Sequence, residues 1–484
     1  MRRVRSTSTR REFLTAAGAA TLTACAPEAQ VEAARPPNIL LVVPDQQRHD
    51  WLGAGGVIPV RTPNVDALAA RGVRFTNAVC ASPLCAPSRA CLASGKEYDR
   101  CGVPSNGFNY PLDQTTYYQL LRDAGYHVMG CGKFDLHKAT EDWGLDGKHL
   151  LPEWGFSDGI DNAGKWDAIR SGSKQPAEPY MGYLHETGLL EMHVADFERR
   201  RGLGGYSFTD PTPLPEHAYC DNWIGAQASR LLDAAPAGKP WHLQVNFTGP
   251  HDPLDATARM VDGYRGVENF PQPNGNTQLS PEVHVAVRQN YSAMIENIDR
   301  WLGLLLEKVE SRGELDNTLV VFTSDHGEML GDHNFWKKRL PYQPSVGVPL
   351  VAAGPGVRGG RTTDALASVM DLAATFLEAA GVAVPATMDS RSLMPLLRGD
   401  AEQHREILHS GMDPWRMVFD GQYKLVRGFD DSISEYYSSR NLPTYAEMQQ
   451  FTLLFDRDAD PLENVNLAAK APDVVKRLEA ALPA

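Results

Sequence analysis

Two pairs of polar residues in the sequence have side chains that suit a divalent cation. Asp45 and Gln46 follow one short apolar run, and Asp325 and His326 follow another. Carboxylate and amide oxygens are the ligands that hard cations such as Ca²⁺ prefer in proteins. His326 adds a nitrogen donor, which is less typical of calcium and is also compatible with Mn²⁺ or Zn²⁺. Each aspartate taken alone could instead cap a helix or shape a turn.

Strands that would position these residues are indicated by continuous, largely aliphatic runs. These runs cover Asn38–Val43, Trp241–Phe247 and Thr318–Thr323. Each is followed by polar residues and a turn signal, a pattern typical of strands buried on both faces of a sheet. Ligands of open α/β sheets bind beyond the carboxyl ends of the strands. The three strands would deliver Asp45, His251 and Asp325 to that edge.

Helical patterns lie between the apolar runs, at Tyr117–Ala124, Val283–Val309 and Met370–Ala380. Glycine follows the first and the third, as is typical of helix C-termini. Alternating strands and helices predict an α/β fold with a large mixed, mostly parallel sheet covered by helices on both faces.

The pattern of predicted secondary structure changes after Pro385. Short strand-like runs alternate with turns there, at Met417–Phe419, Tyr423–Val426 and Leu453–Phe455, and a helix is expected over about 472–482. This predicts a smaller C-terminal subdomain with a short antiparallel sheet and a helix. We therefore divide the chain into an N-terminal signal and tether (1–36), a catalytic domain (37–384) and the C-terminal subdomain (385–484).

The segment Cys85-Ala86-Pro87-Ser88-Arg89 resembles the Cys-x-Pro-Ser-Arg hallmark of the sulfatase family, in the alkaline-phosphatase-like superfamily. Five residues alone could match by chance, but further motifs follow in the order typical of that family. They are Gly125-Tyr126 with Gly132-Lys133, Gly249-Pro250-His251-Asp252-Pro253, Ser324-Asp325-His326-Gly327-Glu328, Lys338 and the C-terminal segments 392–397 and 460–464. The resemblance covers about residues 38–470.

The resemblance implies that a dedicated maturase oxidises Cys85 to formylglycine. One hydroxyl of the hydrated aldehyde would lose its proton at a divalent metal, most simply Ca²⁺, and attack the sulfur of a sulfate ester. The second hydroxyl would then expel sulfate and regenerate the aldehyde. The implied metal ligands are Asp45, Gln46, Cys85, Asp325 and His326.

Four further residues receive roles from the same resemblance. Lys133 and Lys338 would hold the sulfate oxygens. Arg89 lies one helical turn from Cys85 and would stabilise the hydrate. His251 would protonate the leaving oxygen, because the pKa of histidine lies near neutrality.

Two positions depart from the family pattern. Sulfatases place a histidine shortly after the first lysine, where this chain has Asp135, and His137 follows. Either residue could be the base that triggers sulfate release; we favour His137, since an ionised Asp135 would repel sulfate. Gln46 replaces a common second aspartate, which removes a negative charge and is expected to weaken metal binding.

A Gly- and Asp-rich insertion over about 141–215 shows weak periodicity. Long irregular segments inside enzymes are often substrate loops. Trp143, Trp154 and Trp166 lie in it and could stack on sugar rings or pack in the core.

The N-terminus resembles an export signal. Arg10-Arg11 precede a short apolar stretch, as in twin-arginine signals, and Leu22-Thr23-Ala24-Cys25 resembles a lipobox whose cysteine is lipidated. We expect a periplasmic protein or a membrane-anchored lipoprotein, although a plain signal peptide could also contain Cys25. Seven cysteines show no zinc-type spacing, and at least one is expected to be a buried free thiol.

The formal net charge of -13 argues against a nucleic-acid-binding protein. We predict hydrolysis of sulfate esters, on sulfated carbohydrates. One alternative is a phosphonate or phosphate-diester hydrolase on the same scaffold. Another, of a different class, is a non-catalytic glycan-binding lipoprotein, against which the complete set of motif residues argues.

Overall fold

The structure is a computed structural model that describes residues 35–202, 205–275, 277, 279–429 and 452–483. Pro36–Ala484 forms one compact unit. The predicted signal and lipobox, including Cys25, lie outside the described residues. The domain boundary at residue 385 stays a prediction.

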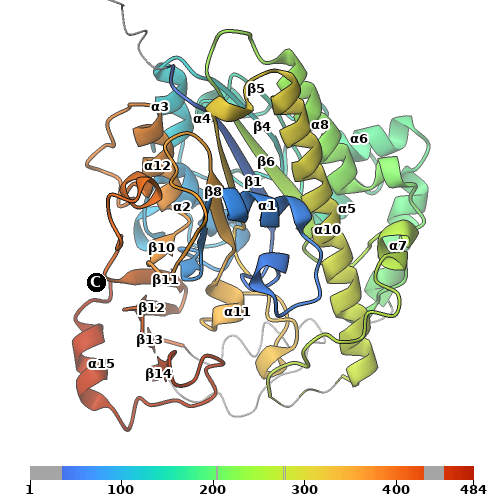
Figure 1. The fold of residues 1–484 in the computed structure, drawn as a ribbon. Coiled ribbons are helices and arrows are strands. Elements are labelled where there is room, and N and C mark those ends of the chain that lie inside the picture. Colours follow the sequence, from blue (N-terminus) through green and yellow to red (C-terminus); the bar gives the residue numbers. More distant parts are fainter. Residues whose placement is uncertain (1–34, 203–204, 276, 278, 430–451, 484) are drawn as a thin grey trace, which may run out of the picture. The chain divides into compact units, whose positions relative to one another are not determined.

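An eight-stranded sheet forms the centre of this unit, in the order β5-β4-β6-β1-β7-β8-β2-β9 (Figure 1). The strands in that order are Asp158–Asp161, His127–Gly132, Trp241–Pro250, Asn38–Asp45, Thr318–Thr323, Leu350–Ala353, Val73–Phe75 and Arg361–Thr363. Strands β5, β4, β6, β1 and β7 are mutually parallel, and β8 runs antiparallel to its neighbours β7 and β2. The predicted mixed, mostly parallel sheet is confirmed.

Strand β1 is buried on both faces, as its uninterrupted apolar run predicts. Alternate side chains point to opposite faces of a strand. Accordingly, Ile39 and Leu41 pack in one hydrophobic core, and Leu40 and Val42 pack in a second core on the other face. All of β1 is therefore removed from solvent.

Helices cover both faces of the sheet (Figure 1). On one face the core includes residues of α1 (Pro63–Arg71), α8 (Cys220–Ala234) and α10 (Pro281–Ser311). On the other face it includes residues of α2 (Cys85–Ser94), α3 (Tyr117–Asp123) and α12 (Asp371–Ala379). The predicted helices are confirmed. At most helix ends, the observed boundary lies within two residues of the predicted one.

Helix α3 shows why the local sequence forms these elements. The Thr116 hydroxyl accepts from the backbone N–H of Gln119 (3.1 Å), and the Gln119 side chain accepts from the backbone N–H of Thr116 (3.0 Å). This reciprocal capping satisfies two N–H groups that the first turn leaves unpaired. The helix stops before Gly125, whose φ of 96° suits a residue without a Cβ.

A four-stranded antiparallel sheet lies towards the C-terminus, in the order β11-β12-β13-β14. Its strands are Leu408–Met412, Trp415–Phe419, Tyr423–Arg427 and Thr452–Asp456. Helix α15 (Pro472–Glu479) packs Leu478 against Val418, Leu425 and Leu454 of this sheet. The expected short sheet and helix are confirmed.

In the described residues, the insertion at 141–215 contains four α-helices and a strand, which corrects the expectation of an irregular segment. It contains α4 (Leu151–Trp154), β5, α5 (Lys165–Gly172), α6 (Pro179–Glu186) and α7 (Leu190–Gly202). Each helix is short, so its apolar periodicity is hard to recognise in the sequence. Trp143 and Trp154 are buried in the cores, whereas Trp166 is only partly buried.

The six cysteines in the described residues are all buried free thiols. This confirms the expectation of at least one free buried thiol. None of the described helices combines the length and apolarity that a membrane span requires.

Candidate active site

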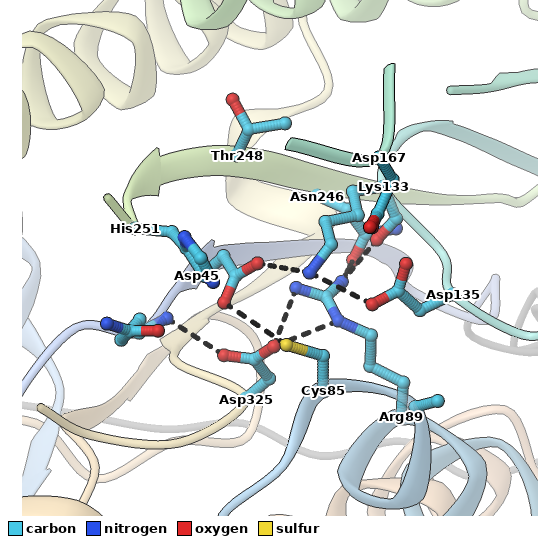
Figure 2. Close-up of polar contacts among 12 residues, drawn as sticks. Asp45, Cys85, Arg89, Lys133, Asp135, Asp167, Asn246, Thr248, His251 and Asp325 are labelled. Atoms are coloured by element: carbon cyan, nitrogen blue, oxygen red, sulfur yellow. Dashed lines mark hydrogen bonds and ion pairs between the residues drawn. The ribbon is translucent and has the colours of Figure 1, made fainter. Parts of the chain in front are cut away.

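Residues from four neighbouring strands and one helix meet at one edge of the sheet (Figure 2). Asp45 ends β1, and Lys133, His251 and Asp325 follow β4, β6 and β7. Cys85 is the first residue of α2, which points its N-terminal end at this edge. The predicted convergence at the carboxyl ends of the parallel strands is what brings these side chains together.

Four buried residues, Asp45, Cys85, Asp325 and His326, form what we call the cation-ligand group. One ligand atom from each lies within 4.8 Å of all the others. Sγ of Cys85 is 3.8 Å from Oδ1 of Asp45 and 3.3 Å from Nε2 of His326. Nε2 of His326 is 3.6 Å from Asp45 and 3.7 Å from Asp325. Donor atoms this close converge on a space of the size of a single cation.

The orientation of His326 fits a metal ligand. Its Nδ1 lies 3.1 Å from the carbonyl oxygen of Gly327, to which the ring N–H donates. That bond leaves the lone pair of Nε2 directed at the cation-ligand group, in the arrangement that protein metal sites use to orient histidine. Two carboxylates and one imidazole suit a divalent cation, and they do not by themselves select calcium over manganese or zinc.

Gln46 lies beside the cation-ligand group, and its place among the metal ligands stays a prediction. Its Oε1 accepts from Nζ of Lys338 (2.6 Å), and its Nε2 donates to Glu328. Its backbone N–H donates to Asp325 (2.9 Å) from a left-handed conformation with φ of 72°. Gln46 therefore links Lys338 to the strand end.

Cys85 lies among positive charges. Nζ of Lys338 is 3.1 Å from its Sγ. Burial and the charge of Asp45 raise the pKa of the thiol, but Lys133, Lys338 and His326 together lower the pKa of Cys85 well below its ordinary value. The pKa of Asp45 is also held well below its usual range; burial raises it, and the charges of Lys133, His251 and Lys338 outweigh that effect. An anion is therefore favoured at this position.

The Ser and Arg of the Cys-x-Pro-Ser-Arg segment attach α2 to Asp325. The hydroxyl of Ser88 donates to the backbone carbonyl of Asp325 (2.5 Å). The Arg89 guanidinium contacts Oδ2 of Asp325 through Nε (3.0 Å) and Nη2 (2.9 Å). Pro87 stands in the first helical turn, where its missing N–H has no helical partner to lose. These contacts fix Cys85 against the end of β7.

Arg89 also contacts residues of β6 and of the segment after β4, and its role in stabilising the hydrate at residue 85 stays a prediction. Besides Asp325, it donates to the backbone carbonyl of Lys133 and to Oδ1 of Asn246 (3.2 Å). It thereby joins the ends of β4, β6 and β7 (Figure 2).

The ammonium group of Lys133 is buried between two carboxylates. Nζ contacts Oδ2 of Asp45 and lies 2.9 Å from Oδ2 of Asp135. A second buried lysine, Lys138, contacts the same oxygen of Asp135 at 2.9 Å and Asp167 at 2.5 Å. Burial lowers the pKa of Lys138, but the charges of Asp135 and Asp167 outweigh that effect and raise it above its ordinary value.

His251 lines the cavity at Cys85 and is the most exposed of the predicted catalytic residues. Its Nδ1 lies 2.6 Å from the backbone carbonyl of Asp252. The ring N–H at Nδ1 donates to that carbonyl, which leaves Nε2 able to exchange a proton with a bound substrate. This arrangement suits the predicted proton donor.

The structure does not bring His137 to the cysteine, which corrects its expected position in the site. Nδ1 lies 3.0 Å from Asp142, and Nε2 lies 2.9 Å from Asp161. The ring is fully buried, with both nitrogens occupied by carboxylates. Burial lowers the pKa of His137, but Asp161 and Asp142 raise it by more than burial lowers it. The net shift of this pKa is therefore upward. An imidazole held in this way is not free to accept a proton from residue 85.

Asp135 is the residue of this segment that reaches the site (Figure 2). Oδ2 contacts Lys133, and Oδ1 is buried without a hydrogen-bond partner among the described residues. Asp135 adopts a left-handed backbone with φ of 56°, a conformation that costs energy for a non-glycine residue. The turn directs its carboxylate towards Lys133 and carries His137 away.

We did not predict from the sequence that a row of buried polar side chains on β6 would reach the site. Tyr117 donates to Gln244 (2.9 Å), Gln244 donates to Asn246 (2.9 Å), and Asn246 accepts from Arg89. The signal was present in the sequence, because His242, Gln244 and Asn246 alternate with apolar residues and must face the same side of the strand.

A cavity of about 930 Å³ opens at these residues. Asp45, Cys85, Lys133, His251 and Lys338 all contribute to its lining. The predicted nucleophile, the predicted proton donor and both predicted sulfate-binding lysines therefore line one cavity.

Comparison with known proteins identifies the family. Residues 37–382 match the model of the family described as sulfatase, and residues 331–483 match the model described as N-sulphoglucosamine sulphohydrolase, C-terminal. The chain belongs to the sulfatase family. The predicted sulfuric ester hydrolase is thereby confirmed, and the buried group of Asp45, Cys85, Asp325 and His326 is the candidate metal site of this sulfatase.

Curated relatives of this sulfatase are similar over most of their length. An arylsulfatase of Clostridium perfringens is 27% identical over 89% of this chain and 90% of its own. An N-acetylglucosamine-6-O-sulfatase of Bacteroides thetaiotaomicron is 26% identical over 95% of this chain and 88% of its own. A choline-sulfatase of Rhizobium meliloti is 29% identical over 89% and 82%, respectively.

Solved structures share the fold. A phosphonate monoester hydrolase of Agrobacterium radiobacter superimposes with a TM-score of 0.73 at 24% identity, over 92% of this chain and 94% of its own. A protein solved in complex with its substrate D-glucosamine-2-N,6-O-disulfate gives a TM-score of 0.69 at 22% identity, over 92% and 96%.

Proposed function

We propose that this sulfatase hydrolyses sulfate esters of carbohydrates, with residue 85 acting as formylglycine and a divalent cation held by Asp45, Asp325 and His326. One observation carries the proposal: Sγ of Cys85 lies within 4 Å of two candidate cation ligands and of the ammonium group of Lys338. Sγ marks the position at which the converted side chain would present its oxygen atoms.

The residues around Cys85 can meet each chemical need of sulfate-ester cleavage. The cation would neutralise charge on sulfate and favour the deprotonated form of the nucleophile. Lys133 and Lys338 would hold sulfate oxygens as fixed positive charges. His251 would donate the proton that the departing alcohol needs.

Two observations support a carbohydrate as the alcohol. The cavity of about 930 Å³ is far larger than a sulfate group requires. Trp166 also lines it, and aromatic side chains offer a flat apolar surface. The N-acetylglucosamine-6-O-sulfatase relative and the solved structure with a disulfated glucosamine are consistent with such a substrate.

Mass spectrometry and kinetics test this proposal. After co-expression with a formylglycine-generating maturase, the peptide that contains residue 85 should carry the mass of an aldehyde or its hydrate. The matured enzyme should cleave aryl sulfates and a subset of sulfated saccharides, and Cys85→Ala should abolish both activities. Full turnover by Cys85→Ala would contradict the proposal.

A phosphonate or phosphate-diester hydrolase is a second candidate. Gln46 and Asp135 stand where many sulfatases carry a second aspartate and a histidine, so the charge around the substrate differs from the common pattern. The ratio of kcat/KM for an aryl sulfate to kcat/KM for an aryl phosphonate or phosphodiester separates the two candidates. We expect the ratio to favour the sulfate.

We also propose that the protein is exported and anchored to a membrane through Cys25. The support is the sequence of residues 10–25 alone. In a bacterial host, Cys25→Ala should move the protein from the membrane fraction to the soluble periplasmic fraction. Unchanged membrane association would contradict the lipid anchor.

A further inference from the structure

One wall of the cavity is not used by the chemistry at Cys85. It is lined by Lys138, Trp166, Arg170, Arg201 and Lys337. With about 930 Å³, the cavity lies near the upper end of the range for small-molecule sites. A sulfated group at Cys85 would leave room for the rest of a saccharide along this wall.

Trp166 provides a fixed aromatic surface on that wall. Its Nε1 donates to Oδ2 of Asp252 (3.0 Å), and its ring packs edge-on against Phe197 with centroids 5.2 Å apart. The side chain is only partly buried. A tryptophan held at both ends and open on part of its surface is suited to contact the apolar face of a sugar ring.

Asp252 places Trp166 on the side from which the alcohol leaves. The carboxylate of Asp252 accepts from Trp166, and the backbone carbonyl of the same residue accepts from Nδ1 of His251. His251 is the proposed proton donor to the departing oxygen. The sugar attached to that oxygen must therefore extend from His251, and the tryptophan fixed next to it lies on that side.

Arg201 supplies a positive charge beside Trp166. Its Cζ lies 5.5 Å from the centroid of the Trp166 ring. The side chain is exposed and, among the described residues, has no carboxylate within ion-pair distance. The two preceding arginines of α7 differ, because Arg199 pairs with Asp210 (3.1 Å) and Arg200 pairs with Asp196 (2.8 Å).

The other cations of this wall are already paired. Lys138 and Arg170 both contact Asp167, at 2.5 and 2.8 Å, and Lys337 contacts Asp252 at 2.9 Å. Glu198 also lines the cavity, one turn before Arg201 on α7. The charge that remains for a ligand on this wall is therefore that of Arg201.

We propose that Trp166 and Arg201 form a subsite for a sugar ring that carries a second acidic group, a sulfate or a carboxylate, next to the ester that is cleaved. The inference rests on the proposed function and narrows its substrate class to saccharides with more than one acidic group. Trp166 contacts the ring, and the planar guanidinium of Arg201 binds the second anion, for which its geometry is suited.

Calorimetric titration of the unmodified protein tests the subsite without any turnover. The probes are D-glucosamine 6-sulfate, D-glucosamine-2-N,6-O-disulfate, a uronic acid-containing disaccharide of glucosamine 6-sulfate, and inorganic sulfate. The two probes with a second acidic group should bind more tightly than the monosulfated sugar. Comparison of these two probes tells whether sulfate or carboxylate is preferred.

Arg201→Gln should weaken binding of the probes with two acidic groups about fivefold more than binding of the monosulfated sugar, as expected for a partly exposed charge pair. Arg199→Gln is the matched control, on the same helix but outside the cavity, and should change neither affinity. Trp166→Ala should weaken binding of every sugar relative to inorganic sulfate, and Trp166→Phe should restore most of the loss.

Three results would overturn the subsite: equal effects of Arg201→Gln on mono- and diacidic sugars, the same effect from Arg199→Gln, or no preference of the unmodified protein for the diacidic probes. A result that contradicts the proposed function, rather than the subsite, can be told apart from these. In that case the matured enzyme fails to cleave aryl sulfate, whatever the titrations show.

Discussion

Lys424 and Glu463 form a buried ion pair in which Nζ and Oε1 are 2.5 Å apart and both side chains are 0% exposed. Nζ of Lys424 also donates to the carbonyl of Pro341 (3.2 Å). Glu463 accepts from the backbone N–H of Gln343 (2.7 Å). The pair thus connects the four-stranded sheet to the segment that begins at Lys338, whose ammonium lies next to Cys85.

Breaking this pair should cost both stability and activity. Lys424→Met leaves the buried Glu463 carboxylate with only the more distant Arg457 (3.8 Å) as a cation, which is expected to lower the free energy of unfolding by about 3 kcal/mol. The kcat should fall as well, because the segment that carries Lys338 loses its support. Thermal unfolding and aryl sulfate kinetics measure the two effects.

The exposed pair of Arg427 and Glu479 on the same sheet provides the control for that experiment. Arg427→Gln should change stability by less than about 1 kcal/mol and leave kcat intact. A Lys424→Met variant that unfolds at the wild-type temperature, or that keeps full kcat, would show that the buried pair does not support Lys338.

Acid stability should depend on Asp371. Burial would raise the pKa of this carboxyl, but hydrogen bonds from Arg405 and His404 lower it to about 2. Because the pKa in the folded protein lies below its ordinary value of 3.8, the stabilisation is complete above that value and is lost as the pH falls towards 2. The contribution is about 2 kcal/mol.

Urea unfolding at pH 5 and at pH 2.5 measures this contribution. Asp371→Asn should be less stable than the wild type at pH 5, and the gap should narrow at pH 2.5. Glu378→Gln is a suitable control, because its ion pair with Arg398 is partly exposed. A constant gap between wild type and Asp371→Asn at both pH values would contradict the assignment.

The step that releases sulfate should depend on Asp135 rather than on His137. Asp135→Asn is expected to give a burst of released alcohol followed by turnover about 100-fold slower, as for loss of a general base in the second step. Rapid-quench kinetics with an activated aryl sulfate reveals the burst. Its absence would remove Asp135 from that step.

His137 should instead act on stability. His137→Ala leaves Oδ2 of the buried Asp161 without its histidine partner, so the free energy of unfolding should fall by about 2–4 kcal/mol. Below the unfolding temperature the variant should show no burst. A burst with His137→Ala and none with Asp135→Asn would restore the role that the sequence suggested for His137.

Removal of divalent cations should inactivate the enzyme. Dialysis against a chelator is expected to abolish turnover and lower the melting temperature, because a cation that binds only the folded state stabilises it. Re-addition of Ca²⁺, Mn²⁺ or Zn²⁺ in turn, with metal analysis, identifies the ion. His326→Ala should weaken the affinity of the protein for the cation about tenfold or more. His409 contacts Glu97 instead, so His409→Gln should leave that affinity unchanged. Full activity after chelation would contradict the metal site.

Most of the fold and the cation-ligand group could be predicted from the sequence, because buried parallel strands leave an unambiguous pattern. The uninterrupted run at Asn38–Val43 fixes Asp45 at a strand end, and Thr318–Thr323 does the same for Asp325. Neighbouring parallel strands then place both residues at one edge, whatever the details of the connections.

The segment after β4 could not be predicted in this way. Asp135, Glu141 and Leu150 all adopt left-handed conformations, which no spacing rule anticipates for these residue types. As a result, Asp135 and not His137 faces Lys133. Gln46 also has a left-handed backbone, and its side-chain oxygen accepts from Lys338.

The burial of Cys85 has a consequence for the timing of its conversion. Only 1% of the residue is exposed, and the whole of α2 is buried around it. If residue 85 is converted to formylglycine as proposed, the converting enzyme needs access to a thiol that the docked helix keeps from solvent. Under the proposed function, conversion would then compete with folding, and chains that dock α2 first would keep the thiol. The fraction of active molecules in a preparation would be set by the supply of maturase during synthesis, and refolding in its absence would not restore it.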